Sequence, residues 1–184
     1  MINPFEKQNL KTSEDNKSFT DGATIENLGE ILEIKLQIAK DNAPDLTPSE
    51  FKNLRRVGSE EVRNKLAEAV VQVDTLFEFK RILEMCGLPK DWIQRFLAHE
   101  NAHANKAESV GAVFNKYEVA FLREDKTVMP RLVSVSIGVH DHLSKEESSQ
   151  MWTDIISAPE EYGSSLSEHD IEDLKNFASK DISS

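Results

Sequence analysis

The sequence contains a single cysteine, Cys86, among its 184 residues. One cysteine cannot form an internal disulfide or a cysteine-based zinc cluster, and its scarcity suits a reducing compartment. The chain also lacks any apolar run long enough to span a membrane. Residues 1–22 lack the basic and then apolar pattern of a signal peptide, so we expect a cytoplasmic protein.

Positive charge is scarce as well. The chain has 22 basic and 33 acidic residues, which gives a formal net charge of −11. This excess of negative charge opposes binding to nucleic acid or to an anionic membrane surface, and we expect neither as a partner. A chain of this length fits one domain and can bury a core without a metal ion to hold it together.

Hydrophobic periodicity predicts a mostly helical chain. Residues 1–22 are polar with isolated apolar side chains, and we interpret them as a mobile tail before a single domain over residues 23–184. The segment from Glu60 to Met85 contains no glycine or proline and has apolar residues in helical register, which predicts the longest helix. Other helices are expected over residues 24–40, 47–57, 90–110, 144–156 and 168–179.

One segment has the two-residue period of a β-structure. Apolar and polar residues alternate on either side of a polar turn at residues 123–126, which predicts an antiparallel hairpin over residues 114–139. Pro130 should lie at the hairpin entry or on an edge strand, because proline cannot donate a ladder hydrogen bond. The predicted fold class is therefore α+β and mostly helical, with five or six helices packed against one hairpin.

The predicted helix over residues 90–110 contains the sequence His99-Glu100-Asn101-Ala102-His103. Two imidazoles one helical turn apart can bind one metal ion, and the glutamate between them can reach a water molecule on that ion. On a helical wheel with Trp92 at zero, His99 lies at about 340°, His103 at about 20° and Glu100 at about 80°. All three fall within the apolar stripe, where unpartnered charge is costly, and a divalent cation would supply the missing partner.

This segment resembles the active-site helix of zincin-type metallopeptidases. Leu97, Asn101, Ala102 and Ala104 match the uncharged residues that surround the ligands in that family, whereas Asn105 departs from its pattern. The resemblance covers about ten residues, and it implies one Zn²⁺ ion, ligands at the two histidines and a peptide or protein substrate. By the same resemblance, Glu100 would be the general base in hydrolysis of a peptide or amide bond.

A catalytic zinc ion usually has three protein ligands. A strand that returns beside the motif helix comes level with His103 near Glu118, which makes Glu118 the first candidate for the third ligand. A cross-strand ion pair between Glu118 and Arg131 explains that glutamate equally well. His140 and His142 are alternatives because two histidines two apart on an extended segment project to one side. Two further acidic residues remain open as ligands or as ion-pair partners of Lys or Arg: Asp74 and Glu84.

Other interpretations of the motif remain. The histidines can be core residues bonded to carbonyls, with Glu100 paired to a buried Lys or Arg, or the three can be hydrated at a helix end. The Glu-x-x-His spacing also occurs in di-iron helices, but that site needs a second copy, and the sequence has none. The alternative to a zinc hydrolase is a non-catalytic helical interaction protein with a structural metal or a buried His/Glu cluster.

Overall fold

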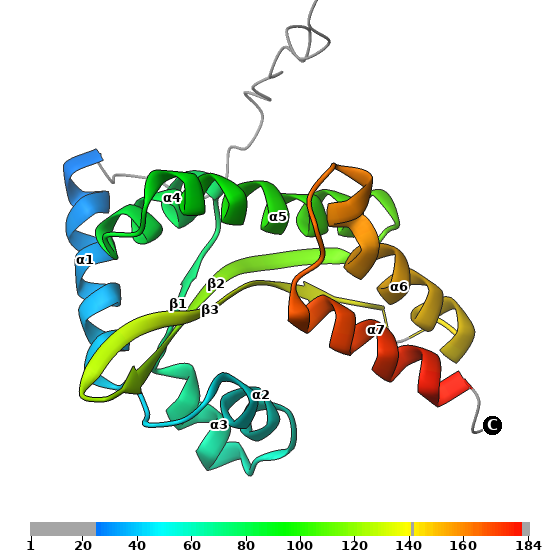
Figure 1. Ribbon diagram of the computed structural model, residues 1–184, viewed down its shortest axis with the longest axis horizontal. Helices are drawn as coiled ribbons and strands as arrows, with labels where there is room; N and C mark the ends of the chain where they lie inside the picture. The colour runs from blue at the N-terminus through cyan, green and yellow to red at the C-terminus, as the bar shows by residue number, and fades with distance from the viewer. Residues whose placement is uncertain (1–24, 141, 182–184) are drawn as a thin grey trace, which may run out of the picture.

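The computed structural model describes residues 25–140 and 142–181, and the side chains of residues 27–140 and 142–175 (Figure 1). The helices of the described residues are α1 (Ile25–Asp41), α2 (Pro48–Val57), α3 (Glu60–Ala67), α4 (Leu76–Met85), α5 (Lys90–Ser109), α6 (Lys145–Glu161) and α7 (Glu168–Asp181). The strands are β1 (Val70–Val73), β2 (Val113–Glu124) and β3 (Thr127–Gly138). The mostly helical α+β class is thus confirmed, and the hairpin belongs to a three-stranded sheet.

The three strands form one antiparallel sheet in the order β1-β2-β3. Val71 of β1 is opposite Val119 of β2, and Glu118 of β2 is opposite Ser134 of β3. Because side chains alternate along a strand, Val71 and Val119 share one face of the sheet and Glu118 belongs to the other. Strand β3 is an outer strand, so one of its edges is unpaired within the described part of the chain.

Helices cover both faces of this sheet (Figure 1). On the face of Val71 and Val119, α1, α4 and α5 contribute to the larger core cluster, which includes Leu32, Phe79, Ile82 and Phe121. On the opposite face, Phe51 of α2 and Leu66 of α3 pack with Ala120, Leu122 and Leu132. The sheet therefore has α2 and α3 on one face and α1 and α4 on the other.

The single long helix predicted over residues 60–85 is wrong. The structure has α3, strand β1 and α4 in that range. The β-branched residues of Val70-Val71-Gln72-Val73 pair with β2, a long-range contact that a local helical period does not reveal. Thr75 then caps α4, with the Thr75 hydroxyl bonded to the Glu78 backbone and the Glu78 carboxylate bonded to the Thr75 backbone.

The hairpin follows the predicted range but has a different register. Asp125 and Lys126 form the turn with φ values of 48° and 68°, as a two-residue hairpin loop requires. An irregularity between Ala120 and Phe121 then leaves Arg131 as an extra residue. Arg131 consequently forms an ion pair with Glu124, and the expected pair between Arg131 and Glu118 does not form.

The remaining predicted helices agree with the structure to within a few residues. Thr47 and Ser144 cap α2 and α6 with complete capping boxes, and α5 covers nearly the whole of the predicted 90–110 range. The predicted tail, residues 1–22, lies outside the described residues. Within the described ranges, no helix is both apolar and long enough to cross a membrane.

Candidate metal centre

Helix α5 presents the motif side chains towards the interior. Glu100 and His103 are 5% and 6% exposed, and His99 is half-buried beside them. Trp92, which marked the centre of the predicted apolar stripe, is instead 53% exposed and packs edge-on against Phe96. The inward direction of the motif agrees with the helical wheel, but the stripe does not extend to the first turn of α5.

A backbone carbonyl of α6 determines which nitrogen of His103 faces the site. His103 Nδ1 lies 2.8 Å from the carbonyl oxygen of Ile155. A carbonyl can only accept, so Nδ1 carries the proton and donates it to Ile155. In the neutral ring, Nε2 of His103 is then left with a free lone pair directed towards His99, as a metal ligand requires.

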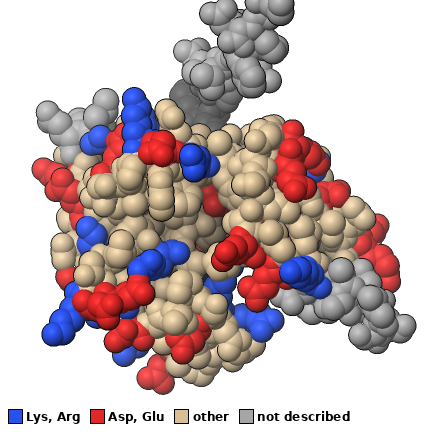
Figure 2. Space-filling view, in the orientation of Figure 1, with Lys and Arg blue, Asp and Glu red and all other residues tan. Residues whose placement is uncertain are grey.

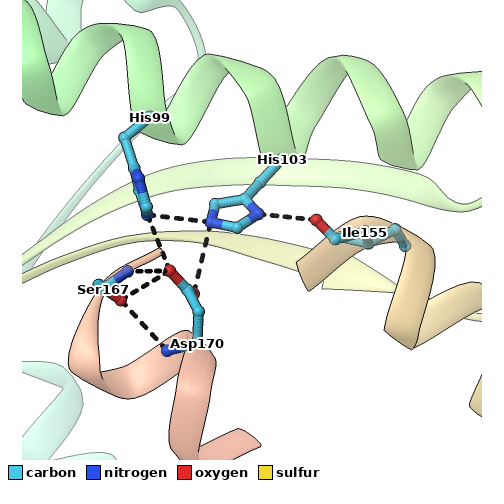
Figure 3. Close-up of polar contacts among 5 residues, drawn as sticks. All are labelled: His99, His103, Ile155, Ser167 and Asp170. Carbon is cyan, nitrogen blue, oxygen red and sulfur yellow. Dashed lines mark hydrogen bonds and ion pairs between the residues drawn. The ribbon is translucent and has the colours of Figure 1, made fainter. Parts of the chain in front are cut away.

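The third member of the cluster is Asp170, in the first turn of α7 (Figure 3). One carboxylate oxygen lies 3.0 Å from Nε2 of His99, and the other lies 3.5 Å from Nε2 of His103. Ser167 donates to the carboxylate from its backbone N–H and its hydroxyl, at 2.8 and 2.7 Å. These hydrogen bonds orient the carboxylate towards the histidines.

The pKa values of this cluster reflect that contact. Burial lowers the pKa of His103, but hydrogen bonds to Asp170 and Ile155 outweigh it, so the pKa is raised above 6.5. Burial acts to raise the pKa of Asp170, yet the bonds from His103, His99 and Ser167 hold it well below its ordinary value of 3.8. In the metal-free protein, Asp170 is therefore an anion that favours the protonated form of His103.

The spacing of these side chains fits a tetrahedral zinc ion. Two ligand atoms that each lie about 2.0–2.1 Å from such an ion are about 3.3 Å from each other. The Nε2 atoms of His99 and His103 are 3.2 Å apart, and each is contacted by a different oxygen of the Asp170 carboxylate, at 3.0 Å for His99 and 3.5 Å for His103. Donor atoms of all three residues lie within 4.8 Å of one another. The donor set, two imidazoles and one carboxylate, is one that zinc commonly binds.

Glu100 is buried beside this cluster and lines the same cavity as the two histidines and Asp170. Burial raises its pKa to about 7, and the nearby His103 and His99 oppose that rise. No described Lys or Arg forms an ion pair with Glu100, in contrast to the interpretation of the motif as an ordinary core cluster. A buried carboxyl group with a pKa near neutrality is typical of a general base.

These residues line a cavity of about 590 Å³. Its walls are one face of α2, part of β3, and the facing parts of α5, α6 and α7, so the motif side chains lie at one end of a space that can hold a ligand. Figure 2 shows a hollow between the α2–α3 pair and α7, with basic and acidic side chains at its rim. The cluster can therefore be reached from solvent.

No family model, curated protein or solved structure matches this chain.

The structure gives Glu118 partners other than the histidines. The Glu118 carboxylate accepts hydrogen bonds from Arg55 at 3.0 Å and from Gln72 at 2.6 Å. Glu118 lines the cavity, but it is not part of the cluster of donor atoms within ligand distance. The ion-pair interpretation of Glu118 thus holds with Arg55 as its partner, because α2 packs on the face of the sheet that carries Glu118.

The other candidate ligands also lie outside the cluster. His140 and His142 follow β3, are exposed and stack on each other with ring centroids 5.3 Å apart. Asp74 forms an ion pair with Lys116, and Glu84 pairs with the basic side chains of its own helix at 3.4 and 3.7 Å. None of these four residues lines the cavity.

The sequence patterns described above do not single out Asp170. Ser167 and Asp170 exchange hydrogen bonds that cap the start of α7. The adjacent His169 is half-buried and lines the cavity. No local pattern distinguishes a capping aspartate from one that also faces a distant helix, so the fold was needed to find this residue.

Proposed function

We propose that this protein is a zinc-dependent hydrolase in which His99, His103 and Asp170 bind the ion and Glu100 is the general base. The observation that carries this proposal is the close approach of one ligand atom from each of three residues, all within 4.8 Å of one another, beside a buried carboxylate in an open cavity. Glu118, the first candidate in the sequence, is replaced in this proposal by Asp170.

The chain's own residues supply the other parts of the reaction. When bound, zinc would polarise a carbonyl group and lower the pKa of water. Glu100 accepts a proton from the attacking water and returns it to the leaving amine as the C–N bond breaks. The positive charge of the ion would also lower the pKa of Glu100 and keep it anionic at neutral pH. Ile155 and Ser167 hold His103 and Asp170 in their ligating orientations.

A peptide or amide is the substrate class that we favour. Strand β3 has one edge that is unpaired within the described part of the chain, and its residues from Leu132 to Val135 line the cavity wall. An extended peptide can form main-chain hydrogen bonds with an exposed strand edge, which would bring one of its carbonyl groups towards Glu100. This arrangement supports hydrolysis of a peptide bond.

Zinc content and hydrolysis, measured separately, test the proposal. The protein is purified without an affinity tag after zinc-replete expression, and bound metal is measured by mass spectrometry. We expect one zinc ion per chain, lost in His99→Ala, His103→Ala and Asp170→Asn. Glu100→Gln should keep the metal and lose hydrolysis of a peptide mixture. Wild-type protein without zinc would overturn the proposal.

Two variants serve as matched controls. His140→Ala removes a histidine of the stacked pair outside the cavity, and Glu118→Gln removes the carboxylate bound by Arg55. Both should keep one zinc ion, and loss of zinc in either would return that residue to the ligand set. If zinc binds and no peptide is cleaved, while the ligand variants unfold, the metal is structural and the interaction protein is the better description.

A further inference from the structure

Beyond the metal centre, the cavity has a basic wall on α2. Lys52, Arg55 and Arg56 all line the cavity, and their spacing of three and four residues places them on one side of the helix. In a chain with a net charge of −11, three neighbouring cations facing one cavity are unusual. They lie across the cavity from α7, which carries Asp170.

Arg55 already interacts with two other side chains of the protein. Its guanidinium forms the 3.0 Å ion pair with Glu118, and it lies 5.9 Å from the centre of the Phe51 ring. Phe51 is buried in the core cluster beneath α2. Arg55 therefore attaches α2 to the sheet and fixes which side of the helix faces the cavity.

Lys52 and Arg56 have no such partner. Neither lies within ion-pair distance of a carboxylate in the described part of the chain, and the contact that Arg56 makes is a 3.3 Å hydrogen bond to the Asn53 amide. Lys52 is half-buried and lines the cavity. Two cations one helical turn apart thus remain available to a ligand in the cavity.

The carboxylates nearby do not neutralise this pair. Glu118 is bound by Arg55, and Asp170 is bound by the two histidines and Ser167. Asp173 of α7 is exposed at the rim, where water screens its charge. Glu100 remains, at the end of the cavity where hydrolysis would occur.

Lys52 shares this cavity with Glu100. Both side chains belong to its lining, as does Arg56. An anion bound at Lys52 would therefore occupy the same cavity as the general base.

Resting on the hydrolase function proposed above, we propose that Lys52 and Arg56 bind a carboxylate of the substrate. The substrate class is then an acidic peptide, with the carboxylate supplied by a Glu or Asp side chain or by a free C-terminus. Both sources present the same planar anion to an ammonium and a guanidinium group. The two cations set specificity, whereas the metal cluster and Glu100 carry out the cleavage.

The first test compares matched peptides on the zinc-loaded full-length protein. Cleavage of a peptide mixture is followed by mass spectrometry, with each Glu peptide paired to its Gln counterpart and each free C-terminus paired to an amide. We expect kcat/KM to favour one acidic member by about tenfold, largely through KM. Preference for Glu over Gln identifies a side chain as the source, and preference for the acid over the amide identifies the C-terminus.

Variants then connect the preference to α2. The double variant Lys52→Gln, Arg56→Gln should lose most of the preference while keeping its zinc content. Lys52→Glu should reverse the preference. The control is Lys65→Gln on α3, an exposed lysine that does not line the cavity. Cleavage without preference for either acid, or a preference unchanged in the double variant, overturns this inference and leaves the hydrolase function standing.

A binding measurement separates the two proposals if no peptide is cleaved. The zinc-loaded Glu100→Gln variant is titrated calorimetrically with a blocked glutamyl tripeptide, its glutaminyl counterpart and a tripeptide with a free C-terminus. We expect tighter binding of an acidic peptide, weakened about tenfold by adding Lys52→Gln and Arg56→Gln. Equal binding of all three peptides overturns the carboxylate subsite. Tighter acidic binding without cleavage by the wild-type protein overturns only the hydrolase.

Discussion

Replacing Asp170 with asparagine tests the composition of the metal centre. An asparagine at this position can still accept a hydrogen bond from Ser167, so the cap of α7 is largely kept while the anionic ligand is removed. A change in a residue that merely supports a ligand typically weakens metal affinity by 10–100-fold, so loss of one of three ligands should weaken it by at least about 100-fold. That factor corresponds to about 2.7 kcal/mol.

The loss of affinity appears as a loss of thermal stabilisation, since zinc that binds only the folded chain stabilises it in proportion to the logarithm of its affinity. For a chain of this size, about 2.7 kcal/mol corresponds to a difference of about 5–11 °C in Tm. We expect the rise in Tm on adding zinc to be smaller by that amount in Asp170→Asn than in the wild-type protein, at one buffered concentration of free zinc.

The quantity compared is the rise in Tm that zinc produces within each variant. Asp170 also contacts both histidines without a metal, so its replacement changes the metal-free Tm as well, and subtraction removes that contribution. His140→Ala should show the full wild-type rise in Tm. An equal zinc effect in Asp170→Asn and the wild-type protein would refute the assignment of Asp170 as a ligand.

Three further predictions follow from the same contacts. Removal of zinc with a chelator should increase hydrogen exchange in α7, which has no buried side chain in its described part, while α4 stays protected. In the metal-free protein, Asp170, whose pKa is depressed, stabilises the fold above pH of about 4, and His103, whose pKa is raised, stabilises it below pH of about 6.5. The Tm of the metal-free protein should therefore fall from pH 6.5 to pH 8. The Tm of the zinc-loaded protein should rise over the same range, because protons compete with zinc for the ligands at lower pH. Thermal melts of both forms from pH 4 to pH 8 measure these two trends. Arg55→Met should lower stability by about 1–3 kcal/mol, because it leaves Glu118 buried with Gln72 alone, and zinc affinity by calorimetry should not change.

Local signals in the sequence were sufficient for most helices. The capping boxes at Thr47 and Ser144 start α2 and α6 where predicted, because each cap uses hydrogen bonds within four residues. The same signal at Thr75 and Glu78 marks the start of α4, but the apolar period running through residues 60–85 concealed it. Strand β1 depends on pairing with β2, and such a distant partner is not visible in a local window.

In the candidate site, too, local signals predict some residues and long-range packing determines the others. The inward direction of His99, Glu100 and His103 follows from the helical period, which the sequence contains in full. The estimate that led to Glu118 assumed only that a strand returns beside α5, and it did not include Arg55 and Gln72, which bind the Glu118 carboxylate. Asp170 comes from another helix altogether, so only the packing of α7 could bring it within 3.0 Å of His99.

The division of the ligands between α5 and α7 also has a consequence during synthesis. Asp170 follows His103 by roughly 70 residues, which a ribosome needs about 3–14 s to add. Throughout that interval the nascent chain contains the two histidines and Glu100 without the third ligand. On the proposed function, the metal centre would be complete only once α7 has been made, so the unfinished chain would not yet be an active hydrolase.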